Sequence, residues 1–310
     1  MKILLASSID PAAMAELERR HDVVRAIGAP PDELAELVRD REAVVVRSGA
    51  NISAAVLDQA PNLALVVRAG SGLDNIDVDH ARRCGVQVVR VPGSSAQPVA
   101  EMTFGLLLAV VRKVALADRL LREGHWPKPQ LGGPLLAGKT LGIVGAGRIG
   151  SRVGAMGTAW GMRALGCVDR PGPAIAASLA EQGITLTDFG TVVAEADFLC
   201  LHLPLDDKTR HIVNAGVLAR MKPGSFPSSL TTTDGNVLGA ALDVHEVEGE
   251  GVRSPLAALP NVVLTPHIGA MAWDSQRLIG ERVVELLAAY ERGSLDELLQ
   301  PDEAVVGSVG

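Results

Sequence analysis

Hydrophobic residues in the first 90 positions form short continuous runs separated by amphipathic segments. The apolar runs, such as KILLAS near the N-terminus and LALVVRAG from Leu63, are typical of buried strands. The segments between them are typical of helices, as in DPAAMAELERR, where Asp10 is the expected N-cap and Pro11 the first helical residue. This alternation predicts a parallel sheet covered by helices on both faces.

A second series of the same kind begins at KTLGIVGAGRIG and continues through ALGCVD, ADFLCLHLP, GAALDV and NVVLTPHIG. Between the two series, residues 96–124 predict one long helix that is apolar on more than one face. The pattern therefore predicts an α/β protein with two doubly wound parallel-sheet (Rossmann-like) domains. The first comprises residues 1–95 and 275–310, and the second residues 96–274, including the long helix.

Composition narrows the possible partners of this 310-residue chain. Its formal net charge is −7 and it has no long Lys/Arg run, which argues against nucleic acid. The longest apolar run, residues 104–111, is too short for a membrane span, and the N-terminus reads as a strand rather than a signal peptide. The three cysteines form no CxxC pair and lack metal-ligand spacing, so we expect no metal and predict a reducing cytoplasm.

A glycine-rich turn, GAGRIG, joins an apolar run to the start of a helix in the second series. Gly145 allows the tight turn, Gly147 lets the backbone approach a pyrophosphate, and Gly150 lets the helix pack closely on the strand. Asp169 ends the next apolar run, where a carboxylate binds ribose hydroxyls and repels a 2′-phosphate. We therefore predict NAD as cofactor in preference to NADP, a preference that the adjacent Arg170 would soften.

Two histidines stand at strand ends, His202 in CLHLP and His267 in NVVLTPHIGA. Open α/β sheets bind their ligands at the carboxyl ends of the strands, and histidine is the most frequent acid–base residue. A histidine at such a position is nevertheless more often structural than catalytic. On the residues alone, both alternatives remain open for each.

Seven segments stand in the same order as in the D-isomer-specific 2-hydroxyacid dehydrogenases, which the chain resembles over nearly its whole length. They are VVRAGSGLDNIDV, SSAQPVAEMTFGLLLAVVR, GKTLGIVGAGRIG, ADFLCLHLPL, MKPG, GAALDV and NVVLTPHIGA. The chain is most similar to the phosphoglycerate dehydrogenase branch, in its short form without a regulatory domain. The resemblance implies hydride transfer between NAD(H) and a small D-2-hydroxy or 2-keto acid. It also implies an interdomain cleft and a homodimer formed through the helix at 96–124.

The resemblance also implies roles for individual residues. His267 matches the acid–base histidine, and Glu248 matches its carboxylate partner, with Glu246 as a rival because Gly249 replaces the usual proline. Asp243 would lie beside the nicotinamide carboxamide. The cofactor-binding set is Gly145, Gly147, Arg148, Ile149, Gly150, Asp169, His202, Pro204 and Asp243. The substrate-binding set is Arg47 and Ser48, at the far end of the substrate, and Gly70, Ser71 and Gly72, whose N–H groups would hold its carboxylate.

Acid–base chemistry agrees with these roles. Oxidation of a 2-hydroxy acid needs a base on the hydroxyl group, and the reverse reaction needs an acid. In general, a neighbouring carboxylate orients a histidine ring and raises the histidine's pKa. One histidine can then act as the base in oxidation and as the acid in reduction. A guanidinium would complete the set by gripping the substrate carboxylate with two hydrogen bonds, a task that suits arginine and not lysine.

The segment that carries this arginine in the family is too short here. Between Gly224 and Gly239 there is no arginine, and the 14 residues from Ser225 to Leu238 are about a dozen too few for a strand and a crossover helix. SFPSSL would be a strand remnant, although Pro227 does not suit a central strand, and TTTDGNVL the end of the lost helix.

Three explanations of the short segment are open: a real deletion, a sequence incomplete at this point, or a substitute arginine such as Arg253. We favour incompleteness, because deleting a crossover should damage the sheet as well as the site. The leading hypothesis for function is an NAD-dependent, phosphoglycerate dehydrogenase-like enzyme. The alternative is a catalytically weak or silent NAD-binding regulatory or interaction protein.

Overall fold

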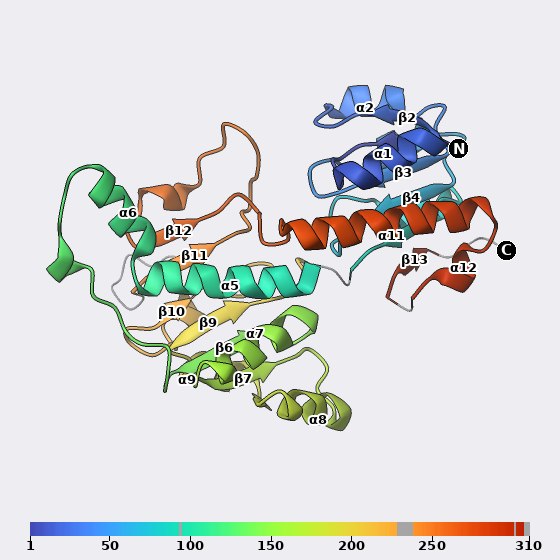
Figure 1. Ribbon diagram of the computed structural model, residues 1–310. Helices are drawn as coiled ribbons and strands as arrows, with labels where there is room; N and C mark the ends of the chain where they lie inside the picture. The colour runs from blue at the N-terminus through green and yellow to red at the C-terminus, as the bar shows by residue number, and fades with distance from the viewer. Residues whose placement is uncertain (93–94, 228–237, 301, 307–310) are drawn as a thin grey trace. The chain divides into compact units, whose positions relative to one another are not determined.

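A computed structural model describes residues 1–92, 95–227, 238–300 and 302–306 (Figure 1). The chain divides into two compact units. Unit 1 comprises Met1–Ser95 and Met271–Gly310, and unit 2 comprises Ala96–Ala270. Both units are mixtures of helices and parallel strands, as the hydrophobic pattern predicted.

Unit 1 contains a six-stranded sheet in the order β13-β5-β4-β3-β1-β2. The first five strands in sequence are parallel, and β13 runs antiparallel to β5. The strands are β1 (Lys2–Leu5), β2 (Asp22–Arg25), β3 (Ala43–Val46), β4 (Leu65–Arg68), β5 (Gln87–Arg90) and β13 (Ala304–Val306). Side chains in β3 and β4 are buried along the whole strand, as expected for a sheet covered on both faces.

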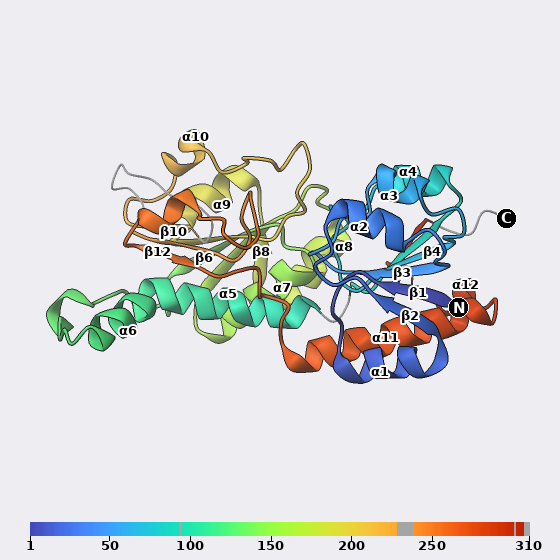
Figure 2. The ribbon, with the colours of Figure 1, turned by 90° about the horizontal axis from the view of Figure 1, so that it is seen from above.

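Helices cover both faces of this sheet (Figure 2). Alternate strand residues such as Ile3 and Leu5 pack with α1 and α11, whereas Leu4 packs on the opposite side with α2, α3 and α4. The helices are α1 (Pro11–Arg20), α2 (Pro31–Leu37), α3 (Ala54–Asp58), α4 (Val78–Arg83), α11 (Trp273–Glu291) and α12 (Leu295–Leu298). The two sides of one strand therefore contribute to two separate hydrophobic cores.

The start of α1 confirms the predicted cap. The Asp10 carboxylate accepts hydrogen bonds from the backbone N–H groups of Ala12 and Ala13, at 3.0 and 3.1 Å. Such a cap stabilises a helix by about 1 kcal/mol. Gly280 of α11 lies against the same turn, where an added Cβ would stand 2.7 Å from the Ala13 Cβ. The absence of a side chain at residue 280 therefore lets α11 pack closely on the start of α1.

Unit 2 contains a five-stranded parallel sheet in the order β10-β9-β6-β7-β8. The strands are β6 (Thr140–Val144), β7 (Arg163–Cys167), β8 (Ile184–Leu186), β9 (Phe198–Leu201) and β10 (Phe226–Pro227). The direction of winding reverses between β6 and β9. In open sheets, ligands bind in the crevice at the carboxyl ends of the strands at such a reversal.

Two helical layers enclose the sheet of unit 2. One core lies under α5 and α7, and the other under α9 and α10. The helices are α5 (Ala96–Val111), α6 (Val114–Arg122), α7 (Arg148–Ala159), α8 (Pro173–Glu181), α9 (Phe189–Glu195) and α10 (Ala215–Leu218), with 3-10 turns η2 (Lys128–Gln130) and η3 (Pro255–Ala258). In the described part of the chain, no helix combines the length and apolar character needed to cross a bilayer.

The prediction of one helix over residues 96–124 is wrong, because the structure has α5 and α6 with a break at residues 112–113. Lys113 adopts a left-handed conformation with φ 51°, which ends α5. The returning connector explains the break. The Lys113 ammonium donates to the Gln130 carbonyl at 2.9 Å, and an added Cβ at Gly133 would stand only 1.8 Å from the Val111 carbonyl oxygen. Two helices therefore replace one, and α6 extends away from the sheet (Figure 1).

The C-terminal strands of unit 2 form a separate pair. Strand β11 (Ala240–Leu242) runs parallel to β12 (Val262–Leu264), and within the described ranges this pair is a sheet of its own. Strand β10 ends the five-stranded sheet, an edge position that tolerates Pro227 because no N–H is needed there. The rest of the predicted strand remnant and helix end, residues 228–237, lies outside the described residues.

Candidate active site

The glycine-rich turn between β6 and α7 has the geometry of a phosphate cradle. Gly145 has φ 90°, and a Cβ there would stand 2.4 Å from the His202 carbonyl oxygen. A Cβ at Gly150 would stand 2.2 Å from the Gly145 carbonyl oxygen, whereas nothing lies within 4 Å of one at Gly147. Arg148 and Ile149 open α7, so the positive end of the helix dipole faces the turn. The close packing at residues 145 and 150, with open space at 147, fits a pyrophosphate.

A cavity of about 620 Å³ lies at the carboxyl edge of the same strands. Gly145, Asp169, Asp188 and Leu203 are among its lining residues. The Asp169 side chain is 74% exposed, and the Arg170 Nε lies 3.8 Å from its carboxylate. A volume of this size is typical of cofactor sites. Asp169 therefore lines the same cavity as the glycine turn, and its contact with a ribose stays a prediction.

His202 directly follows β9, beside this turn. Its backbone N–H donates to the Val144 carbonyl at 2.9 Å. Its Nε2 is buried, with no hydrogen-bond partner among the described residues. Burial lowers the pKa of His202 to about 4, so the ring is neutral at physiological pH. Pro204 follows as an exposed residue whose carbonyl accepts from the Thr209 hydroxyl.

His267 follows β12 in a left-handed conformation, with φ 54°. Its Nδ1 lies 2.9 Å from the Glu248 Oε2, and the two side chains are 42% and 37% exposed. The other oxygen of Glu248 accepts from the His245 N–H at 3.0 Å, which fixes the carboxylate. A non-glycine residue in this conformation costs roughly 1–3 kcal/mol and persists only where the surroundings hold it. Because Nδ1 faces Glu248, Nε2 remains for a substrate.

Asp243 supplies part of that hold. Its two carboxylate oxygens accept from the N–H groups of Ile268 and Gly269 at 2.9 and 2.7 Å, and from the Thr265 hydroxyl at 2.6 Å. His245 also donates through Nε2 toward the Thr265 carbonyl, at 2.9 Å. Asp243 thus ties the end of β11 to the turn that carries His267. The resemblance assigned Asp243 to the cofactor site, and the sequence did not indicate that its carboxylate also holds the turn of His267.

The rivals considered from the sequence lie elsewhere. Glu246 approaches His211 and Arg210 at 3.7 and 4.0 Å, so Glu248 is the carboxylate that the structure brings to His267. Arg253 is exposed in the loop between β11 and β12.

Two arginines stand at the carboxyl edge of the unit 1 sheet. Arg47 follows β3, where its guanidinium donates to Gln276 and lies 3.8 Å from the Met271 sulfur. Arg68 ends β4 with only 7% of its surface exposed, and its Nε has no partner among the described residues. Burial lowers the pKa of Arg47, and burial lowers that of Arg68 to about 10. Ser48 is exposed beside Arg47.

The glycine loop after β4 is shaped around Arg68. The Gly70 N–H donates to the Arg68 carbonyl at 2.8 Å, whereas no described residue accepts from the following amides, at Ser71 and Gly72, so these two suit an anion. Gly70 has φ 152°, and a Cβ there would stand 2.6 Å from the Arg68 guanidinium. The Ser71 hydroxyl lies 3.1 Å from the Pro92 carbonyl and anchors the loop.

Sequence reasoning missed Arg68 as a site residue. A signal was present, because a charged residue ends the otherwise apolar run LALVV just before a glycine pair. Arg68 is buried, and among the described residues its guanidinium makes no hydrogen bond to a carboxylate. This is unusual, because burying a charge without a partner of opposite charge is costly. The net effect of burial is to lower the pKa of Arg68. The negative charge of Asp74 partly offsets this lowering, and the positive charge of Arg47 adds to it. Unit 1 therefore concentrates positive charge at the edge where Arg47 was predicted to bind substrate.

Known proteins agree with these features. The profile of the D-isomer specific 2-hydroxyacid dehydrogenase NAD binding domain matches residues 104–226. The hydroxypyruvate reductase of Thermotoga maritima is 39% identical over 269 residues, covering 82% of this chain and 86% of the relative. The D-3-phosphoglycerate dehydrogenase of Methanocaldococcus jannaschii is 36% identical over 96% of this chain, which spans only 59% of that relative. A D-lactate dehydrogenase from Aquifex aeolicus, solved with NAD and lactic acid, has a TM-score of 0.84 and 26% identity over 99% of each chain.

The chain belongs to the D-isomer specific 2-hydroxyacid dehydrogenase family. It is an NAD-dependent oxidoreductase with an NAD-binding Rossmann domain, which confirms the predicted fold, enzyme class and cofactor. The phosphoglycerate dehydrogenase-like resemblance is also confirmed. The alternative of a silent regulatory protein is not favoured by these relatives.

Proposed function

We propose that this protein interconverts a small D-2-hydroxy acid and its 2-keto acid, with unit 2 binding NAD(H) and unit 1 binding the substrate. The observation that carries the proposal is the 2.9 Å contact between His267 and Glu248. This pair lies in the same unit as a cradle that fits NAD. When bound, NAD(H) supplies or accepts the hydride.

The protein's own residues would handle the proton. Glu248 orients the His267 ring, and Nε2 takes the proton of the substrate hydroxyl or returns it to the keto oxygen. The backbone conformation of His267, with Asp243 holding the turn beyond it, fixes the direction of the ring. General acid–base catalysis by a positioned side chain contributes about 10²–10⁴-fold to the rate.

Unit 1 would supply the charge that binds the substrate. The free amides of Ser71 and Gly72 suit a carboxylate, and Arg68 lies directly beneath that loop. Arg47, with Ser48 beside it, suits a second anionic group such as a phosphate. Two desolvated guanidinium groups in one unit favour a substrate with two negative charges. A phosphorylated 2-hydroxy or 2-keto acid, with a carboxylate and a phosphate, is the class we propose.

We also propose a homodimer formed through α5 and α6. None of the α6 residues is buried, and its apolar residues Val114 and Leu121 are more than half exposed. Together with Leu108 of α5 they line an apolar depression. Burial of these side chains against a second copy would remove them from water. A cytoplasmic location remains a proposal, supported by three unpaired cysteines.

The proposal is tested by measuring NADH oxidation with a panel of 2-keto acids, one of them phosphorylated. We expect turnover of at least one member, with NADH binding detected by fluorescence. His267→Asn should lower kcat by about 10²–10⁴-fold while leaving NADH affinity unchanged. Turnover by this variant at the parental rate would overturn the assignment of the acid–base residue. Light scattering on Leu121→Glu, which should be monomeric, tests the dimer separately.

A further inference from the structure

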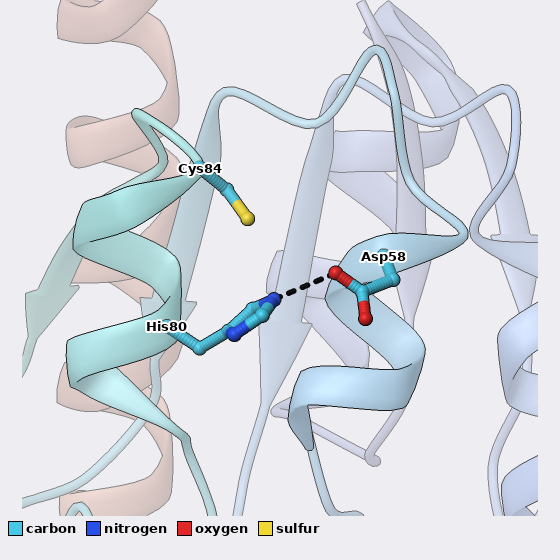
Figure 3. Close-up of side chains that lie close together, drawn as sticks. All are labelled: Asp58, His80 and Cys84. Atoms are coloured by element: carbon cyan, nitrogen blue, oxygen red, sulfur yellow. Dashed lines mark hydrogen bonds and ion pairs between the residues drawn. The ribbon is translucent and has the colours of Figure 1, made fainter.

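Three potential metal ligands gather on the surface of unit 1, apart from the residues assigned above. They are Asp58, the last residue of α3, His80 in α4 and Cys84 just after α4 (Figure 3). The Nε2 of His80 lies 2.7 Å from an Asp58 carboxylate oxygen. One donor atom from each of the three residues lies within 4.8 Å of the other two. Figure 3 shows the Asp58 carboxylate joined to the imidazole by a dashed line, with the Cys84 side chain pointing toward the same two groups.

The elements that carry these residues are well anchored. His80 and Cys84 are one helical turn apart, and the Cys84 N–H donates to the His80 carbonyl at 3.0 Å, so their side chains share a face. Ala81 of α4 and Leu57 of α3 are buried in the same core. The backbone positions of the three donors are therefore fixed, and only side-chain torsions need to adjust.

The donor set has the chemistry of a zinc ligand set. Zinc binds thiolate, imidazole and carboxylate in tetrahedral geometry, with donors separated by roughly 3.3–3.7 Å. The present separations bracket this range, because the imidazole and carboxylate are closer and the outermost donors at most 4.8 Å apart. A thiolate and a carboxylate would together neutralise a divalent ion. A thiolate and an imidazole also select against Mg²⁺ and Ca²⁺, which prefer oxygen ligands.

One neighbour must move for an ion to enter. The Arg83 guanidinium lies 3.0 Å from the His80 Nδ1, and because a guanidinium only donates, Nδ1 is the acceptor and Nε2 carries the hydrogen. Coordination through Nε2 would shift that hydrogen to Nδ1 and displace Arg83. This arginine is exposed, so it is free to swing into solvent. Arg82 is held by Asp79 at 2.7 Å and does not compete.

We propose that Asp58, His80 and Cys84 form a zinc-type site with three protein ligands and a position open to water. The expectation of no metal rested on the spacing of the three cysteines alone, and left the neighbouring histidine out. The spacing of His80 and Cys84 in DHARRC was the signal that it passed over. The site is independent of the proposed reaction, and its occupation would link α3 to α4.

The test uses the full chain, freed of metal with a chelator and titrated with Co²⁺ as a spectroscopic probe. We expect an intense near-ultraviolet band from thiolate-to-cobalt charge transfer, with visible bands typical of tetrahedral Co²⁺, all lost on addition of Zn²⁺. Cys84→Ser should abolish the charge-transfer band. Asp58→Asn and His80→Gln should each weaken binding at least 10- to 100-fold, the loss typical even of residues that only support metal ligands.

Controls are available within the chain. Cys167 and Cys200 are buried, and their burial raises the pKa of each thiol, so they should not substitute for Cys84. Arg83→Gln should tighten binding severalfold, because it removes the competing donor. NADH affinity should not change in any of these variants. A charge-transfer band that persists in Cys84→Ser, or parental affinity in His80→Gln, would show that the ion binds elsewhere and would overturn the proposal.

Discussion

Two parts of unit 2 differ in continuity. Strands β6 to β9, which position the cofactor cradle, lie in one parallel ladder with every connection described. Strands β11 and β12, which position Asp243 and His267, form a separate pair in the described part of the unit. Only 12 residues, 228–239, separate β10 from β11, which is about the minimum length of a crossover with its helix. Among the described residues, the cofactor strands therefore form one continuous sheet, whereas the strands that carry the acid–base pair stand outside it.

The acid–base pair survives this interruption because its contacts are local. Glu248 and His267 belong to loops that Asp243, His245 and Thr265 tie together directly. None of these bonds involves β10. The substrate arginine of the family cannot be preserved in this way, because it belongs to the short segment itself. The comparison therefore predicts cofactor binding without full catalysis.

Restoring the segment should have the largest effect. A family-like strand, arginine and helix inserted after Gly224 should raise kcat/KM by roughly 10²–10³-fold, the amount lost when one preorganised donor is removed. NADH affinity should change little, because the cradle lies on other strands. The measurement is NADH oxidation against the 2-keto acid panel.

The matched control carries the same insertion with glutamine in place of the arginine. It separates repair of the sheet from addition of the guanidinium. If the 310-residue chain already equals the restored one, another arginine acts in its place, and Arg253→Ala is the next variant. An intact mass above that of the 310 residues would show that the sequence is incomplete.

Replacing Arg68, in unit 1, should have the next largest effect on catalysis. Arg68→Gln should raise the KM of an anionic substrate by roughly 10- to 100-fold, since hydrogen bonds to a charged group contribute about 1.5–3 kcal/mol. Ser48→Ala is a control at an exposed neighbour and should have a much smaller effect. The unfolding midpoint in urea should accompany both measurements. An unchanged KM with lowered stability would assign Arg68 to structure alone.

Replacing the partner of His267 should have a smaller effect. Glu248→Gln keeps a hydrogen-bond acceptor but removes the charge, and we expect kcat to fall by roughly 10-fold, less than the 10²–10⁴-fold of the acid–base group itself. Glu246→Gln is the matched control, because Glu246 pairs with His211 and Arg210. A larger loss in Glu246→Gln than in Glu248→Gln would reverse the assignment of the two carboxylates.

Most of the fold could be predicted from the sequence, because continuous apolar runs and capped helices are local signals. Asp10 illustrates this, since both its cap and the following proline stand in one short segment. The break at Lys113 could not be predicted, because its cause is a connector about 20 residues further on, whose Gly133 lies against the Val111 carbonyl. Helix length was decided by a tertiary contact rather than by propensity.

The site could be predicted only where motifs carry the chemistry. The glycine turn and Asp169 have fixed spacing, so their arrangement followed from the sequence. The anchoring role of Asp243 depends on contacts with the turn after β12, and no local pattern encodes it. The apolar run before Arg68 was a local signal, but the burial of this arginine depends on the tertiary structure. The resemblance already favoured Glu248 over Glu246, and the geometry supports that choice, because Glu248 contacts His267 whereas Glu246 approaches His211.

Replacing Asp169 tests the cofactor site at the β6–β9 sheet of unit 2. Asp169→Ala should reduce the preference for NADH over NADPH by about 10-fold or more, because it removes the carboxylate that repels a 2′-phosphate. The Kd values of both cofactors are measured by fluorescence titration. Arg170→Ala should change the ratio in the opposite direction and by less. Tighter binding of NADPH than of NADH by the parent protein would contradict the role of Asp169.

His202 lies at the same sheet, and its burial should make the free energy of unfolding depend on pH. Near neutral pH this is the smallest of the expected effects. The pKa of His202 is about 4 in the folded protein and 6.5 when unperturbed. Above pH 6.5 the ring is neutral in both states and contributes no pH dependence. As pH falls below 6.5, the unfolded chain takes up a proton that the folded protein excludes, so the free energy of unfolding decreases down to about pH 4. One pH unit into this window costs about 1.4 kcal/mol, and the whole window at most about 3 kcal/mol.

Urea unfolding at pH 7 and pH 5.5 measures this contribution. The parent protein should lose about 1 kcal/mol more than His202→Gln between the two values. His211→Gln is the control, because that histidine is largely exposed, and it should behave like the parent. Other groups also titrate in this range, but they are common to the parent and the variant, so the difference isolates His202. An equal loss in parent and His202→Gln would mean that water reaches the β9 end of the cradle and that the cofactor half is less closely packed than its continuous ladder indicates.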